Sequence, residues 1–140
     1  MLSLTPLNRF NWESYLEIQI HSAQENFVPS ILFSLAQAKF ENLFPLGIQL
    51  DNQIVGFLMY GNFSGIFWIN RIIIDKQFQG KGIGKAAIRQ LISQFHQNPQ
   101  CKEIRTSFVV ENIAARKLFT EIGFIPINEE MEGEIIAKYE

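Results

Sequence analysis

Hydrophobic positions divide the chain into short strand-like runs and longer segments with helical spacing. Residues 72–74 are consecutive isoleucines, as in a strand that is covered on both faces. Residues 83–95 place apolar side chains three and four positions apart, which is typical of a helix with one buried face. In order, the pattern predicts strands at 2–7, 46–50, 54–60, 66–74, 103–110, 124–127 and 133–139, and helices at 11–20, 30–42, 83–95 and 112–122.

This succession predicts an α/β sandwich, with a mixed, mostly antiparallel sheet and helices on both faces. A chain of 140 residues suffices for one core, so we expect a single domain over residues 1–140. Asp51-Asn52-Gln53 is expected to close a hairpin, and Gly61–Gly65 a second turn.

The last predicted helix has a signal at each end. Asn112 is a good N-cap, and Gly123 occupies the position after the helix where glycine is favoured. Phe124 follows as the apolar residue that often closes such an end, which predicts a contact between Phe119 and Phe124.

A glycine-rich loop, Gln79-Gly80-Lys81-Gly82-Ile83-Gly84, lies between a predicted strand and a predicted helix. Backbone N–H groups at a helix N-terminus bind anions, and Lys81 and Lys85 add positive charge. An ordinary connection is the alternative, but one glycine would be enough for it. A P-loop needs a hydroxyl residue where Ala86 stands, and a dinucleotide fingerprint needs glycine where Lys85 stands, so neither motif fits.

Two motifs resemble the signatures of the GCN5-related N-acetyltransferase (GNAT) superfamily. The pattern Gln-x-x-Gly-x-Gly at 79–84 is similar to its coenzyme A pyrophosphate loop. The pattern Asn-x-x-Ala-x-x-Leu-Phe-x-x-x-Gly-Phe at 112–124 is similar to its second signature. Residues 34–39, 68–82 and 133–136 also resemble bacterial spermine/spermidine (diamine) acetyltransferases.

The resemblance implies that acetyl-CoA is the cosubstrate and that no metal is needed. It implies a backbone N–H on the strand at 66–74 as the donor to the thioester oxyanion, from Ile73 or Ile74, and we take Ile74. Asn112 would hold the cofactor arm, although it could also be a plain N-cap. The cofactor-binding residues expected are Ile72, Ile73, Ile74, Gln79, Gly80, Lys81, Gly82, Ile83, Gly84, Lys85, Asn112, Ala115, Lys117 and Phe119.

Proton transfer is the less determined part of the expected chemistry. An amine with a pKa near 10.4 must lose a proton before it attacks, directly to a carboxylate or through water. Glu25 and Glu134 are the preferred candidates for this base, with Glu41, Glu111 and His21 as others. The superfamily usually places a tyrosine acid where this chain has Phe119. Either Tyr60, Tyr15 or water takes over this role, or the thiolate leaves unprotonated.

Charge is unevenly distributed, and this bears on the acceptor. Residues 42–127 contain nine basic and five acidic side chains, whereas residues 128–140 contain five Glu and one Lys. A basic middle suits a polyphosphate cofactor and acidic ends suit a cationic acceptor, unless these charges only solvate the surface.

The function expected is therefore transfer of an acetyl group to a primary amine, first of all a polyamine such as spermidine or spermine. Alternatives are acetylation of a protein N-terminus or lysine, and a non-catalytic acetyl-CoA-binding module. The lone Cys101 lies outside both signatures, which favours direct transfer in a ternary complex and suits a reducing cytoplasm. We expect a homodimer, with no nucleic-acid partner at a net charge of −2 and no membrane partner.

Overall fold

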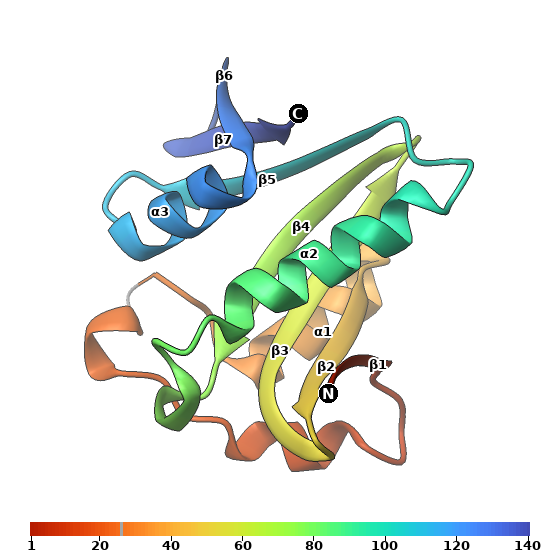
Figure 1. Cartoon of the computed structure of the whole chain (residues 1–140), viewed down its shortest axis with the longest axis vertical. Coiled ribbons are helices and arrows are strands. Elements are labelled where there is room, and N and C mark those ends of the chain that lie inside the picture. Colours follow the sequence, from red (N-terminus) through yellow and green to blue (C-terminus); the bar gives the residue numbers. More distant parts are fainter. Residues whose placement is uncertain (26) are drawn as a thin grey trace.

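The computed structural model describes residues 1–25 and 27–140 and contains a seven-stranded sheet with strand order β1-β2-β3-β4-β5-β7-β6 (Figure 1). Within the described residues, β4 and β5 pair in parallel and the other neighbours are antiparallel. This confirms the predicted α/β fold with a mixed, mostly antiparallel sheet. The elements are β1 (Leu2–Pro6), the 3₁₀ turns η1 (Trp12–Glu17) and η2 (Ser22–Gln24), α1 (Ile31–Glu41), β2 (Phe44–Leu50), β3 (Gln53–Phe63), β4 (Ile66–Ile74), the 3₁₀ turn η3 (Lys76–Phe78), α2 (Ile83–His96), β5 (Glu103–Val109), α3 (Ile113–Ile122), β6 (Phe124–Met131) and β7 (Glu134–Tyr139).

Each face of the sheet has its own core. The larger core packs α2 and α3 against the sheet, with Ala87, Ile88 and Leu91 almost fully buried. The smaller core packs α1 against the other face through Ile31 and Ala38. Helices therefore cover both faces of the sheet, as expected.

The parallel pairing of β4 with β5 is short, and this opens the sheet. The register runs from Ile66–Glu103 to Ile69–Thr106, although both strands continue beyond it. A bulge at Asn70 shifts the β3–β4 register at the same point. Because a bulge bends the strand and increases its twist, the rest of β4 turns away from β5 (Figure 1).

Several predicted ends are confirmed by local geometry. Ser30 caps α1 by accepting a hydrogen bond from Phe33 N, and Asn42 ends the helix with φ 57°. Asp51 and Asn52 both have positive φ, as a two-residue hairpin turn requires.

Three boundaries are wrong. The helix expected at 11–20 is the short η1, because the Asn11 side chain bonds to Asn8 and Pro6 instead of capping a helix. The strand β3 continues through Phe63, so only residues 64–65 of the turn expected at 61–65 lie between β3 and β4. β6 extends to Met131 rather than ending at 127.

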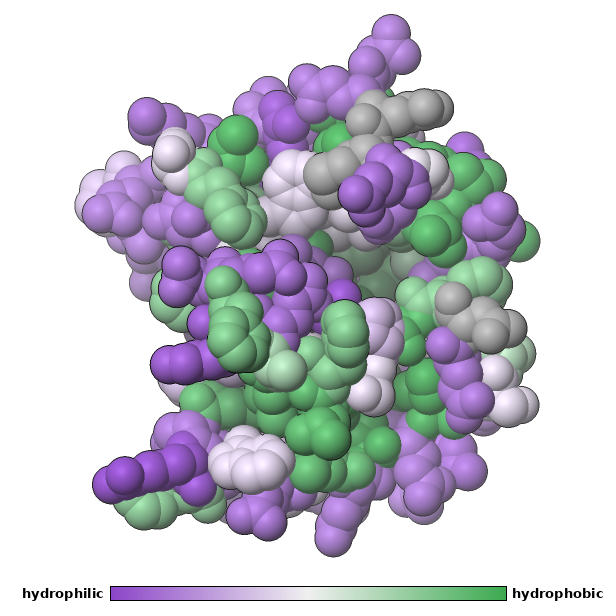
Figure 2. All heavy atoms as spheres, turned by 180° about the vertical axis from the view of Figure 1, so that it is seen from behind, coloured by the Kyte–Doolittle hydropathy of each residue, from purple (hydrophilic) through white to green (hydrophobic). Residues whose placement is uncertain are grey.

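The face that carries α1 exposes apolar side chains. Leu32, Phe33 and Phe40 on α1 have more than half of their surface exposed. In the space-filling view of this side, apolar residues gather in the lower half (Figure 2). None of the helices in the described ranges is both long and apolar enough to cross a membrane.

Candidate acetyl-CoA site

A cavity of about 540 Å³ lies where β4 separates from β5. Its walls come from four places: the segment before α1, the end of β4, the glycine loop with the start of α2, and α3. The lining residues are Ile20, Gln24, Phe27, Val28, Ile72, Ile73, Ile74, Phe78, Gln79, Gly80, Gly82, Ile83, Gly84, Lys85, Asn112, Ala114, Ala115, Lys117, Leu118 and Glu121. Twelve of the fourteen expected cofactor-binding residues are among them, and Lys81 and Phe119 are not.

The glycine loop leaves open space above the start of α2. Gly82 is the N-cap residue of α2, with φ 79° and no capping side chain. A Cβ atom added at Gly80 or Gly82 would meet no other protein atom within 4 Å, so a ligand has room to approach the backbone there. The first N–H groups of α2 have no partner inside the helix, and such groups at a helix N-terminus can bind an anion.

The N-terminus of α3 forms the opposite wall. Asn112 Oδ1 accepts a hydrogen bond from Ala115 N at 3.2 Å, so Asn112 is the N-cap of this helix. The residue also lines the cavity, so the two roles expected for it are compatible. The positive ends of two helix dipoles therefore meet at one cavity.

The charged side chains near the loop differ in position. Lys85 lines the cavity and pairs with Glu121 at 2.9 Å, and this hydrogen bond lowers the pKa of the Glu121 carboxyl. Lys117 lies on the α3 wall. Lys81 is exposed, with its ammonium 5.6 Å from the centre of the Phe78 ring.

Phe119 is a core residue. Its ring centre lies 5.2 Å from that of Phe124, which confirms the predicted contact, and 6.2 Å from that of Phe108. Leu118, its neighbour in sequence, lines the cavity in its place. Contact between Phe119 and a bound cofactor therefore stays a prediction.

Neither tyrosine considered as a proton donor lines the cavity. Tyr60 packs among Phe44, Phe67 and Phe95, where burial raises the pKa of its hydroxyl. Tyr15 is almost fully buried, and its hydroxyl accepts a hydrogen bond from Gln49. These positions do not fit a donor to a thiolate leaving from the cavity.

Two candidate carboxylates lie around Arg71 on the α1 side of the sheet. The guanidinium donates from Nη1 to Ser34 Oγ at 2.8 Å and to Gln37 Oε1 at 2.9 Å. Burial lowers the pKa of Arg71, and the nearby carboxylates of Glu134 and Glu41 oppose this effect. Glu134 from β7 and Glu41 from α1 thus both act on Arg71.

The other candidate residues lie at exposed or loop positions. Glu25 is exposed and follows Gln24, a cavity residue, whereas Glu111 is exposed and precedes Asn112. His21 lies at the N-cap of η2, where its backbone N–H donates to Gln24 Oε1. Cys101 does not line the cavity, and burial raises the pKa of its thiol.

Sequence reasoning missed the wall contributed by the segment before α1. Ile20, Gln24, Phe27 and Val28 line the cavity, whereas the sequence predicts a helix ending at Ile20, a polar loop around Gln24 and no element at residues 27–28. Gln24 meets Gln79 across 55 positions of sequence, and no local pattern reports such a pair.

Comparison with known proteins identifies the family. The model of the acetyltransferase (GNAT) family matches residues 6–124. The chain belongs to this family. It is an acetyl-CoA-dependent N-acetyltransferase, and coenzyme A or acetyl-CoA is bound in structures of its neighbours.

Individual relatives agree in sequence and in fold. The spermine/spermidine N(1)-acetyltransferase of Bacillus subtilis (strain 168) is 32% identical over 123 residues, which is 81% of each chain. The spermidine N-acetyltransferase of Vibrio cholerae, solved with CoA and spermine, superposes with a TM-score of 0.73 at 17% identity, over 98% of this chain and 92% of that one. The aminoglycoside acetyltransferase AAC(6')-Ib, solved with coenzyme A, superposes with a TM-score of 0.81 at 16% identity, over 99% of this chain and 93% of that one. At these low identities the two structures show the GNAT fold, while the Bacillus relative is similar in sequence as well.

Proposed function

We propose that this GNAT enzyme acetylates a polyamine such as spermidine or spermine, with acetyl-CoA in the cavity between the glycine loop and α3. The observation that carries the cofactor part is the open, side-chain-free space over the N-cap of α2. Support for the acceptor comes from the spermine/spermidine acetyltransferase that is similar over 81% of the chain.

Direct transfer needs three steps in one ternary complex. The neutral amine attacks the thioester carbonyl, and the N–H of Ile74 donates to the oxyanion that forms. The C–S bond then breaks, coenzyme A leaves as a thiolate that takes up a proton, and the amine gives up a proton to become the amide. Before the attack, Glu134 or Glu25 would accept the ammonium proton, directly or through water, because the free amine is almost fully protonated at neutral pH. The second proton, lost from nitrogen as the amide forms, balances the one that the thiolate takes up.

A covalent route through Cys101 has little support. The thiol does not line the cavity, and burial raises its pKa, so the reactive thiolate is disfavoured at neutral pH.

Carboxylates near Arg71 favour a cationic acceptor. Glu41 and Glu134 approach the α1 side of β4, the strand that also forms the cavity wall. A polyamine carries several positive charges, so it would be attracted to these groups, while a monoamine would gain less.

The test is an acceptor screen that follows release of free coenzyme A thiol. We expect turnover with spermidine and spermine, and a lower kcat/KM with a monoamine of similar length. Turnover only with a peptide would support the protein-acetylating alternative. Acetyl-CoA binding without turnover on any amine would support the non-catalytic module.

The homodimer and the cytoplasmic location belong to this proposal as well. The exposed apolar residues Leu32, Phe33 and Phe40 on α1 are compatible with a face that a second copy covers. Sedimentation velocity over a range of protein concentrations tests the dimer.

A further inference from the structure

Two glutamine side chains that are 55 positions apart form a reciprocal pair at the cavity wall. Gln79 Nε2 donates to Gln24 Oε1 at 3.0 Å, and Gln24 Nε2 donates to Gln79 Oε1 at 3.2 Å. Gln79 Nε2 also donates to the backbone oxygen of Ile74 at 2.9 Å. The pair thus joins the segment before α1, the glycine loop and the last residue of β4.

A second hydrogen bond attaches the same segment to the same connection. Lys76 N donates to Gln19 O at 2.7 Å. Residues 19–24 are therefore held at both ends against the chain that connects β4 to α2, and Ile20 and Gln24 from this segment line the cavity.

The chemistry of the primary amide explains why two glutamines suit this position. Each amide has one donor side and one acceptor side, so two facing amides satisfy each other and hold each other's rotamer. Gln79 begins the glycine loop, and Ile74 is the proposed oxyanion donor. Fixing the Gln79 side chain therefore fixes the spacing between the loop and the end of β4 before the cofactor arrives, and preorganisation of this kind strengthens binding.

We infer that Gln24 is a positioning residue, which acts through Gln79 to preorganise the cofactor loop and to couple residues 19–24 to occupation of the cavity. The inference rests on the proposed place of the cofactor. It assigns a role in acetyl-CoA binding to a residue on the segment before α1.

A double-mutant cycle on coenzyme A affinity tests this role. In calorimetry, Gln24→Ala should weaken binding by roughly three- to tenfold, the effect of losing one or two neutral hydrogen bonds. In a Gln79→Ala background the same change should have little further effect, because Gln24 acts through Gln79. Unchanged affinity in Gln24→Ala, or additive effects of the two substitutions, would overturn the inference.

Two further variants separate hydrogen bonding from packing. Gln24→Met keeps the length of the side chain without the amide, so it should weaken binding as much as Gln24→Ala does. Wild-type affinity in Gln24→Met would assign Gln24 to packing alone and would overturn the inference. Gln94→Ala removes an exposed glutamine on α2 and should leave the affinity unchanged.

Hydrogen exchange gives a readout that a general loss of stability would not reproduce. Coenzyme A should slow exchange in both residues 19–24 and the glycine loop of the wild type. In Gln24→Ala it should still slow exchange in the loop but no longer in residues 19–24, and equal protection of both in the variant would contradict the coupling. Wild-type protein whose glycine loop gained no protection would instead refute the proposed cofactor site, so the two failures are distinguishable.

Discussion

At the residue scale, Gly82 and Phe119 differ in what surrounds them. Gly82 has φ 79°, a conformation that side-chain-bearing residues rarely adopt, and its Cα faces open space. Phe119, in contrast, is only 4% exposed, and its ring packs against those of Phe108 and Phe124.

Replacing Gly82 with valine should abolish or strongly weaken coenzyme A binding, because the branched side chain would occupy the phosphate space. Gly133→Val is a matched control, because Gly133 has φ 80°, also has no atom within 4 Å of an added Cβ, and lies in the β6–β7 turn. Both variants carry similar backbone strain, but only Gly82→Val should lose binding in calorimetry. Tight binding by Gly82→Val would show that the loop assignment is wrong.

Phe119→Ala should lower the free energy of unfolding by about 3–5 kcal/mol, because it removes a buried ring and leaves a cavity. Phe10→Ala, at an 84% exposed position, should change it by less than about 0.5 kcal/mol. Urea unfolding measures both values, and a similarly small effect at Phe119 would remove the packing role. Phe119→Tyr should fold, and an increase in kcat would support a proton donor at this position.

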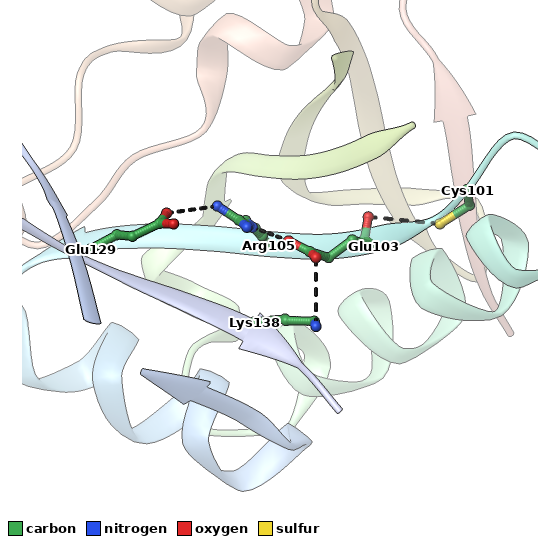
Figure 3. A network of polar contacts seen from close by, with 5 residues as sticks. All are labelled: Cys101, Glu103, Arg105, Glu129 and Lys138. Carbon is green, nitrogen blue, oxygen red and sulfur yellow. Dashed lines mark hydrogen bonds and ion pairs between the residues drawn. The ribbon is translucent and has the colours of Figure 1, made fainter. Parts of the chain in front are cut away.

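At the scale of elements, side-chain ion pairs link the strands β5, β7 and β6 (Figure 3). Glu103 pairs with Arg105 on its own strand and with Lys138 on β7 at 3.5 Å, and Arg105 also pairs with Glu129 on β6 at 2.9 Å. These ion pairs add to the backbone pairing of β7 with β5 and β6, in the part of the sheet that carries Glu134.

Acid should weaken these ion pairs in a defined pH range. Partial burial alone would raise the pKa of Glu103, but the hydrogen bond and charge of Arg105 and the charge of Lys138 lower it below its ordinary value of 4.5. A carboxyl with a lowered folded-state pKa stabilises the fold above its ordinary pKa, and this contribution is lost as the pH falls through the folded-state pKa.

Glu103→Gln should therefore cost about 0.5–1 kcal/mol in the free energy of unfolding at pH 7. The difference from wild type should shrink as the pH is lowered below 4.5. Denaturant unfolding at several pH values measures this, with Glu13→Gln at an exposed site of η1 as the control. A difference that stayed constant down to strongly acidic pH would rule out the ionised pair as its source.

At the scale of the whole molecule, charged side chains gather in two places around β4. Lys85 on α2 and Lys117 on α3 line the cavity, whereas the charges of Glu41 and Glu134 act on Arg71. An anionic cofactor and a cationic acceptor would then reach the same strand from differently charged sides.

The KM for spermidine should rise as the ionic strength is increased from about 0.05 to 0.5 M, because salt screens exposed charges beyond the Debye length. Glu134→Lys should raise this KM more than it raises the KM for a monoamine. Glu13→Lys makes the same charge change at an exposed site of η1 and should have a smaller effect. If spermidine and the monoamine gave equal kcat/KM values that did not respond to salt, the acidic residues would only solvate the surface.

The sequence by itself determined the features that depend on neighbouring residues. The strand Ile66–Ile74, the glycine loop, the N-caps Ser30 and Asn112 and the hairpin at Asp51-Asn52 all follow from residue types within a few positions. Local steric and hydrogen-bonding preferences produce them, so the family and most of the cofactor cavity could be predicted.

Only the tertiary structure decided which distant residues meet. The bulge at Asn70 separates β4 from β5, which opens the cavity, and packing places Phe119 in the core, away from the cavity lining. The pair of Gln24 with Gln79 and the hydrogen bonds from Arg71 to Ser34 and Gln37 join segments that are far apart in sequence. Such contacts depend on how the completed sheet and its helices pack, and no pattern within one segment records that packing.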